Sequence, residues 1–142
     1  MASKGTAQWQ GDLKSGSGTF KAGDGITGSY SFKSRFEDGD GANPEQLIGA
    51  AHAACFSMAL SNALAEAGTP VDSIEATSVV TLRIVDGAPA ITKIELSAVG
   101  TVPGVDDAAF QAAAKDAKEN CPVSKALASV PEMTFEATLA GT

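Results

Sequence analysis

The chain has 142 residues, of which 44% are hydrophobic and 19% are charged, and its formal net charge is −7. This length suits one domain, residues 1–142, which would bury about two thirds of the surface that its unfolded chain exposes. The negative charge and the lack of clustered Lys and Arg exclude nucleic acid and anionic membrane surfaces as partners, because both require basic patches.

The first third of the chain predicts three strands, at residues 7–13, 18–21 and 29–36, separated by turns. Alternation along the third strand places one set of side chains on a single face: Tyr30, Phe32, Ser34 and Phe36. Before it, residues 23–28 match the pattern G-x-G-x-x-G. That pattern indicates dinucleotide binding only where a helix follows. A strand follows here, so we interpret the segment as a hairpin loop.

A long helix is predicted from Asn43 to about Ala67. Asn43 is a favourable N-cap, Pro44 suits the first helical position, and Gly68 ends the helix. Residues 46–65 carry no formal charge, but Ala and Gly dominate the segment and polar residues interrupt it. We therefore interpret it as a core helix and not as a membrane span, which needs about 20 predominantly apolar residues.

The remaining predicted elements are strands at 73–85 and 90–101, a helix at 106–119, a short helix beginning at 122 and a strand at 133–139. Asp86-Gly87 predicts a tight hairpin between the first two, and Asp106 and Cys121 are the expected caps of the two helices. The element order β-β-β-α-β-β-α-α-β is rich in hairpins, so the class is α+β.

The two cysteines, Cys55 and Cys121, are the candidate reactive groups. The first nine residues contain no apolar stretch of signal-peptide length, so we expect a cytosolic protein. Stable disulfides are rare in the cytosol, and paired cysteines there are more often catalytic or redox-sensing. Two inert buried thiols are the alternative interpretation.

No metal or cofactor site is expected. Asp38-Gly39-Asp40 suggests a calcium loop, but the later ligand positions hold Ala42 and Gly49. One His and two distant Cys do not form a zinc pair. His52 lies three residues before Cys55, which leaves a Cys-His acyl-transfer enzyme open, although two side chains on one helix align a base and a nucleophile poorly.

The expected position of each cysteine in its helix predicts which of the two thiols is more reactive. A cysteine reacts as its thiolate, and a helix N-terminus lowers the thiol pKa. Cys121 caps a predicted helix, whereas Cys55 lies in mid-helix and would need a cation from elsewhere. From these residues alone, Cys121 is the predicted nucleophile.

Three separated segments, however, resemble the OsmC/Ohr family of thiol peroxidases. These are Ser34-Arg35-Phe36-Glu37, the run from Asn43-Pro44-Glu45 through Ala54-Cys55-Phe56 to Leu60, and Asn120-Cys121-Pro122-Val123-Ser124. The resemblance extends over nearly the whole chain. It is closer to the osmotically inducible (OsmC) branch than to the organic hydroperoxide resistance branch.

The resemblance implies a peroxidase that reduces organic hydroperoxides to alcohols. It implies that Cys55 is the peroxidatic thiol and Cys121 the resolving thiol, which reverses the ranking from helix positions. It also implies that Arg35 is the catalytic arginine, held by Glu45, and that a lipoyl-type dithiol is the reductant. The implied fold is a long central helix packed on an antiparallel sheet within an intertwined homodimer.

The spacing of Glu45 and Cys55 suggests how such a dimer would work. Ten residues separate them, which is about 15 Å along a straight helix and about 80° around it. Unless the helix breaks or Arg35 spans the gap, an antiparallel partner helix crossing near Ala50 would bring Glu45 of one chain level with Cys55 of the other. Small residues allow such an approach: Gly49, Ala50, Ala51, Ala53 and Ala54. We therefore expect each active site to draw on both chains.

One alternative from a different functional class remains at this stage. The same cysteine pair could serve a non-enzymatic redox sensor or a stress-induced binding protein. Such a protein would form the disulfide without turning over a dithiol.

Overall fold

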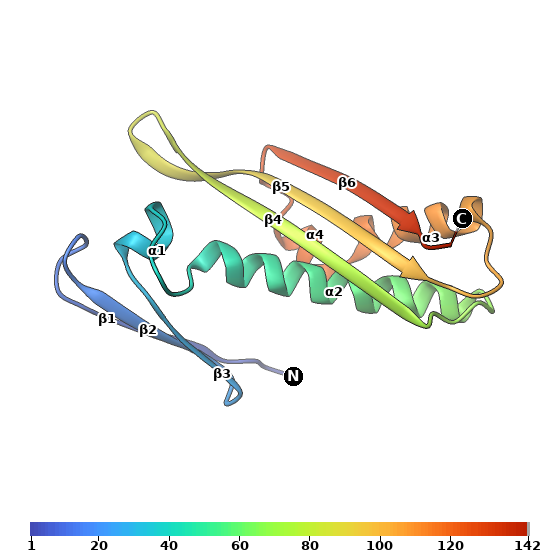
Figure 1. Ribbon diagram of the computed structural model, residues 1–142, viewed down its shortest axis with the longest axis horizontal. Coiled ribbons are helices and arrows are strands. Elements are labelled where there is room, and N and C mark those ends of the chain that lie inside the picture. Colours follow the sequence, from blue (N-terminus) through green and yellow to red (C-terminus); the bar gives the residue numbers. More distant parts are fainter. Residues whose placement is uncertain (142) are drawn as a thin grey trace. The chain divides into compact units, whose positions relative to one another are not determined.

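The computed structural model describes residues 1–141. They form two compact units, residues 1–47 and 48–141, and each is described by itself. Figure 1 shows the first unit in blue and cyan and the second in green to red. The prediction that residues 1–142 form one domain stays a prediction.

The first unit contains an antiparallel sheet of β1 (Gly5–Gln10), β2 (Ser17–Ala22) and β3 (Ile26–Tyr30), in that order (Figure 1). The glycine-rich segment forms the predicted turn only at residues 23–25, with Gly23 at a φ of 57°; residues 26–28, also expected in the loop, belong to β3. Gly28 lies opposite Phe20 across the two strands. A Cβ at Gly28 would lie 2.5 Å from the Phe20 ring, so glycine is what allows the ring to cover the neighbouring strand.

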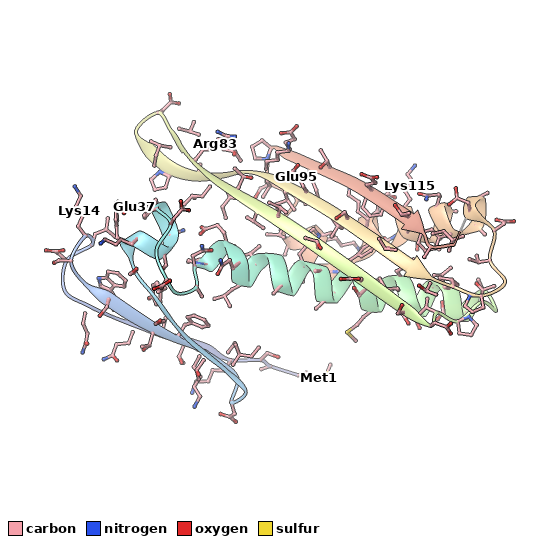
Figure 2. All side chains as sticks on the ribbon, viewed as in Figure 1. Met1, Lys14, Glu37, Arg83, Glu95 and Lys115 are labelled. Carbon is pink, nitrogen blue, oxygen red and sulfur yellow. The ribbon has the colours of Figure 1, made fainter. Side chains whose placement is uncertain are left out.

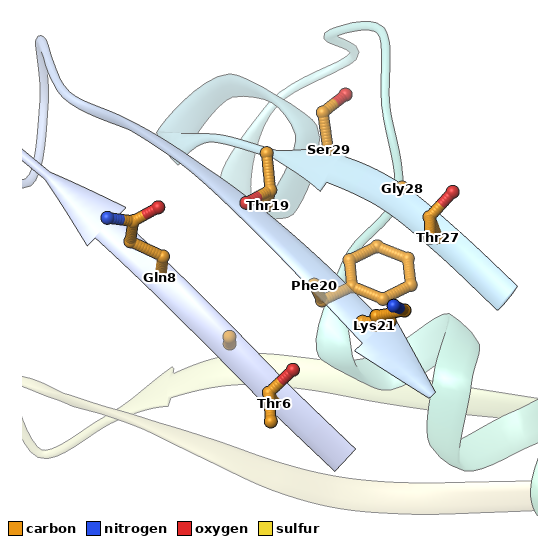
Figure 3. Close-up of a pocket in the computed structure, with 9 residues that line it drawn as sticks. Thr6, Gln8, Thr19, Phe20, Lys21, Thr27, Gly28 and Ser29 are labelled. Atoms are coloured by element: carbon orange, nitrogen blue, oxygen red, sulfur yellow. The ribbon is translucent and has the colours of Figure 1, made fainter. Parts of the chain in front are cut away.

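One face of this sheet is hollowed by about 540 Å³ (Figure 3). The hollow is lined by residues from all three strands: Thr6, Ala7, Gln8, Thr19, Phe20, Lys21, Thr27, Gly28 and Ser29. The Phe20 ring in it is only half-buried. An apolar ring is therefore left partly open to solvent on this face of the unit.

The predicted strand at 29–36 is wrong beyond Tyr30. A short helix, α1 (Phe32–Phe36), follows β3 and adds a helix to the predicted element order. Ser31 and Ser34 cap it reciprocally: the Ser34 N–H donates to Ser31 Oγ at 3.1 Å, and the Ser31 N–H donates to Ser34 Oγ at 2.8 Å. The aromatic spacing that suggested a strand also fits one helical turn, and it brings the Phe32 and Phe36 rings to 5.0 Å.

Helix α2 (Pro44–Glu66) is continuous and begins and ends close to the prediction. Asn43 Oδ1 accepts the Gln46 N–H at 2.8 Å, and Gly68 follows the helix with a φ of 91°. The helix is long and apolar enough to cross a membrane by length and composition, a test that core helices also pass. It supplies Phe56, Leu60 and Leu64 to the core, as expected for a core helix.

The second unit contains a sheet of β4 (Ser73–Val85), β5 (Ala88–Thr101) and β6 (Glu132–Leu139), in that order. The turn between β4 and β5 is the predicted Asp86-Gly87, with φ values of 51° and 83°. β4 and β5 are antiparallel, but β5 and β6 are parallel. The expected antiparallel sheet is therefore mixed. A parallel neighbour requires a long crossover, and α3 (Asp107–Asn120) and α4 (Pro122–Ala126) supply it.

The core lies on one face of this sheet. Along β5 the inward side chains Ile94, Leu96 and Ala98 are buried, while Glu95 and Val99 on the other face are exposed. The inward face packs with residues from α2 and α3: Phe56, Leu60, Leu64, Phe110, Ala114 and Ala117. Figure 2 shows the labelled basic side chains Lys14, Arg83 and Lys115 on three different parts of the chain.

Candidate active site

The two cysteines meet within the second unit. Cys55 on α2 and Cys121 between α3 and α4 are free thiols, with their sulfur atoms hydrogen-bonded to each other at 2.8 Å. Cys121 is 0% exposed, whereas Cys55 is partly exposed. The structure therefore brings together the two residues that the sequence singled out, with one sulfur accessible and one sealed.

Local hydrogen bonds fix Cys121 between two helices. Its N–H donates to the Ala117 carbonyl at 2.9 Å and closes α3, and its carbonyl accepts the Lys125 N–H at 3.1 Å and opens α4. Pro122 occupies the first turn of α4, where a missing N–H costs nothing. The thiol is thus held at a helix N-terminus, as the sequence predicted.

The two thiols have opposite pKa shifts. Burial, followed by the contact with Cys121, raises the pKa of the Cys55 thiol, and the Val123 N–H opposes this only in part. Burial also acts to raise the pKa of Cys121, but hydrogen bonds from Cys55, Ser124 and Val123 outweigh it and lower that pKa overall. Within one chain, negative charge is therefore better stabilised on Cys121. A thiolate at Cys55 needs a further cation.

The first unit holds such a cation. Arg35 on α1 forms a two-point ion pair with Glu45, with Nη2 to Oε1 at 2.8 Å and Nε to Oε2 at 3.3 Å. The guanidinium also lies 5.6 Å from the centre of the Phe36 ring. Glu45 is 6% exposed and belongs to the first turn of α2, where the helix dipole favours an acid. A buried carboxylate and a ring face together fix the plane of the guanidinium.

Each predicted pair of site residues is thus assembled, Cys55 with Cys121 and Arg35 with Glu45. The two pairs belong to different units. The predicted action of Arg35 on Cys55 therefore stays a prediction.

Sequence reasoning did not find two serines that bind His52. His52 is fully buried on α2, its Nδ1 lies 2.9 Å from Ser78 Oγ on β4, and its Nε2 lies 2.8 Å from Ser124 Oγ on α4. Burial, with a smaller contribution from the charge of Lys118, lowers the pKa of His52 and keeps the ring neutral. Because serine hydroxyls occupy both ring nitrogens, the arrangement gives no support to His52 as a base for Cys55.

Two spacings could have revealed this cluster. His52 precedes Cys55 by one helical turn, and Ser124 follows Cys121 by the same interval. If the cysteines meet, residues one turn away from each can meet as well. Within residues 1–141, no group of three or more His, Cys, Asp or Glu side chains is placed to hold a metal ion.

Known proteins resemble this chain in sequence and in fold. The model of the OsmC-like protein family matches residues 37–136, a segment that contains Glu45 and both cysteines. The chain belongs to the OsmC-like family. The resemblance inferred from the three sequence segments is therefore confirmed.

Individual relatives agree with this assignment. The chain is 51% identical to Peroxiredoxin OsmC of Escherichia coli strain K12 over 126 residues, which cover 87% of this chain and 88% of the relative. The protein of the same name from Shigella flexneri matches equally well. Among solved structures, the organic hydroperoxide resistance protein OhrB of Bacillus subtilis superposes with a TM-score of 0.70 at 27% identity, covering 98% of both chains.

A second solved structure supports the fold alone. An organic hydroperoxide resistance protein from Elizabethkingia anophelis superposes with a TM-score of 0.77 at 24% identity, covering 98% of both chains. The α+β class predicted from the sequence is confirmed in the family's fold.

Proposed function

We propose that this chain is a thiol peroxidase that reduces organic hydroperoxides to alcohols, with Cys55 as the peroxidatic thiol and Cys121 as the resolving thiol. The observation that carries the proposal is the pairing of two free thiols 2.8 Å apart, one accessible and one sealed. The name peroxiredoxin, carried by relatives at 51% identity, supports the same reaction.

Accessibility supports the order of the two cysteines. A hydroperoxide must reach the sulfur that attacks it, and Cys121 is 0% exposed while Cys55 is partly exposed. The lower pKa of Cys121 then serves the later steps, in which this sulfur attacks Cys55 and afterwards leaves as a thiolate. Access and acidity thus point to different roles for the two thiols.

The proposed reaction balances without a cofactor. The Cys55 thiolate attacks the outer oxygen of R–O–O–H, the O–O bond breaks, and the alkoxide takes a proton to become the alcohol. Cys55 is left as a sulfenic acid. Cys121 attacks that sulfur, an S–S bond forms, and the departing hydroxyl takes the Cys121 proton to become water. A dithiol, which the family implies to be of the lipoyl type, reduces the disulfide and becomes a disulfide itself.

Arg35 and Glu45 would supply the charge that Cys55 lacks. A guanidinium is permanently positive, so it stabilises the Cys55 thiolate and the charge that develops on the departing alkoxide. The two-point pairing with Glu45 holds the guanidinium in one orientation before the substrate arrives.

We further propose that the working unit is a homodimer in which each site uses both chains. Helix α2 is unbroken between Glu45 and Cys55. A break in the helix therefore does not bring these two residues together. Between residues 48 and 66, α2 leaves a mostly apolar stripe exposed: Ala50, Ala51, Ala54, Met58, Asn62 and Ala65. Met58 is 76% exposed, which is unusual for so apolar a side chain on a central helix.

One of the small residues proposed for the helix contact has another task. Gly49 faces β4 of its own chain, where a Cβ would lie 2.6 Å from the Ser78 carbonyl oxygen. The proposed contact between helices therefore rests on Ala50, Ala51, Ala54 and Met58. We propose the cytoplasm as the place of action, because paired cysteines there are more often catalytic or redox-sensing than structural.

Steady-state reduction of cumene hydroperoxide with a dihydrolipoyl dithiol tests the assignment. Cys55→Ser is expected to show no turnover. Cys121→Ser is expected to consume one equivalent of peroxide, to form a sulfenic acid that dimedone traps, and then to overoxidise and stall. The opposite result, one equivalent consumed by Cys55→Ser and none by Cys121→Ser, would reverse the two roles.

The same assay separates the alternative function. A redox sensor would form the disulfide with peroxide but would not turn over with dithiol. Sustained wild-type turnover therefore excludes a sensor that acts only by a single oxidation.

A further inference from the structure

A line of three polar side chains, two of them buried, ends beside the resolving sulfur. Ser78 Oγ lies 2.9 Å from His52 Nδ1, and His52 Nε2 lies 2.8 Å from Ser124 Oγ. Ser124 follows Cys121, the N-cap of α4, by three residues in the first turn of that helix, and its side chain acts to lower the pKa of Cys121. His52 and Cys121 are each 0% exposed, and Ser124 is 7% exposed. The four groups come from α2, β4, α4 and the α3–α4 junction, which all belong to the second unit.

Satisfying a buried histidine explains part of this arrangement. A buried polar group must be hydrogen-bonded, and two serines suffice for one imidazole. It does not explain why this line ends one helical turn from a sulfur that changes its charge. Cys121 lies out of reach of bulk water, so its charge must be stabilised by groups of the protein itself.

The line can satisfy all its members in both charge states of Cys121. With a thiolate, Ser78 O–H donates to Nδ1, Nε2–H donates to Ser124 Oγ, and Ser124 O–H donates to sulfur. With a thiol, the directions reverse: Cys121 S–H donates to Cys55 Sγ, Ser124 O–H donates to Nε2, and Nδ1–H donates to Ser78 Oγ. Only a neutral imidazole exchanges donor and acceptor between two nitrogens in this way.

We propose that His52 is a positioning residue for resolution: with Ser78 behind it, it directs the Ser124 hydroxyl at Cys121, so that this sealed sulfur gains and loses negative charge without leaving a buried group unpaired. This rests on the proposed function, in which Cys121 attacks the Cys55 sulfenic acid and its proton leaves on the departing hydroxyl as water. When the dithiol attacks Cys55, Cys121 departs as a thiolate. The Ser124 hydroxyl then donates a hydrogen bond to the negative sulfur.

The backbone holds the line in place. Gly49 lies against the Ser78 carbonyl, and His52 follows one helical turn later, so the close approach of α2 to β4 is what brings the ring to Ser78. Lys118 on α3 contributes a positive charge that disfavours imidazolium, and Cys55 on α2 is the other titratable group beside Cys121. The ring is therefore kept in the neutral form that the reversal requires.

Thiolate titration tests the proposal independently of peroxidase activity. In a Cys55→Ser background, Cys121 is the only cysteine, and its ionisation is followed by thiolate absorbance near 240 nm. Ser124→Ala and His52→Gln are each expected to move the midpoint to higher pH by about one unit, since a hydrogen bond to a charged group contributes about 1.5–3 kcal/mol. Ser124→Thr, which keeps the hydroxyl, should restore the midpoint. An unchanged midpoint in Ser124→Ala overturns the proposal.

Single-turnover kinetics test the step itself in the otherwise wild-type chain. After one equivalent of hydroperoxide, the decay of the Cys55 sulfenic acid should be about tenfold slower or more in Ser124→Ala, a larger loss than in the preceding peroxide step. Its rate should also shift along the pH axis with the titration midpoint. Ser57→Ala is the control, because it removes a serine hydroxyl of α2 that donates to the Ala53 carbonyl. Wild-type decay in Ser124→Ala overturns the proposal.

The two measurements keep different failures apart. If the chain reduces no hydroperoxide, the proposed function fails, and the titration still decides whether Ser124 and His52 act on Cys121. If His52→Gln does not fold, Ser124→Ala still carries the test.

Discussion

The two units of this chain differ in what holds them together. The buried hydrophobic side chains, from Phe56 to Leu139, belong to the second unit. The buried residues described in the first unit are Gly18, Ser34 and Glu45. The first unit is stabilised by strand pairing, a capping box and an ion pair, and its aromatic rings remain half-open.

This difference indicates a division of tasks. A core as closely packed as that of the second unit can hold two sulfur atoms and a neutral imidazole in fixed positions. A unit with few buried apolar side chains gains little stability from hydrophobic burial of its own. Under the proposed function, the Arg35–Glu45 pair of this unit would complete a site shared with a partner chain.

The largest expected effect comes from placing the substitutions of Arg35 and Cys55 on different chains of the proposed dimer. Arg35→Gln should lower peroxidase activity by about 10²-fold, because a fixed charge at the developing oxyanion is lost, and Cys55→Ser should have no activity. Dimers reassembled from an equal mixture should recover roughly a quarter of the wild-type rate, since half are mixed and each mixed dimer has one intact site. The rate is measured with dithiol and cumene hydroperoxide.

Lys33→Gln removes a charge from the same short helix and is the matched control, with near wild-type activity expected. No recovery in the mixture would place the Arg35 and Cys55 that act together in one chain and would contradict the shared site.

A smaller difference is expected between aromatic residues of the two units. Phe110→Ala in the second unit should lower the free energy of unfolding by about 3–5 kcal/mol, because a fully buried ring leaves a cavity. Phe36→Ala in the first unit should cost about 1 kcal/mol, yet lower activity about two- to fivefold, because Arg35 loses the ring beneath it. Urea unfolding and steady-state kinetics on the same samples check both. Equal losses of stability would show that the first unit has an apolar core in solution.

The smallest effect concerns the pH dependence of stability. The pKa of His52 in the folded chain lies below its ordinary value of 6.5, because burial disfavours the charged ring. As pH falls, the unfolded chain binds this proton first, so the stability present above pH 6.5 is lost progressively below it. The loss should have a slope of up to about 1.4 kcal/mol per pH unit.

Urea unfolding at several pH values between 7.5 and 5 measures this slope. His52→Gln lacks the titrating group and should show a smaller slope whatever its overall stability. An identical slope in both proteins would mean that His52 titrates alike in the folded and unfolded chains.

Helices and strands could be predicted from the sequence where local signals mark their ends. Asn43, Asp86-Gly87 and Asp106 each act through bonds or turn angles within a few residues, and the elements they delimit begin and end close to the prediction. The strand expected at 29–36 failed because the Phe spacing fits both periods. The reciprocal hydrogen bonds between Ser31 and Ser34 stabilise a helix beyond Tyr30.

The sequence by itself determined the α+β class, the family and the two cysteines, because caps, turns and motifs are properties of neighbouring residues. Tertiary structure alone decided the parallel pairing of β5 with β6, since pairing between strands so far apart in sequence depends on how the crossover packs. It alone joined Ser78 to His52, from residues that share no local pattern. It also decided which sulfur is accessible, because burial depends on what the rest of the chain places around each thiol.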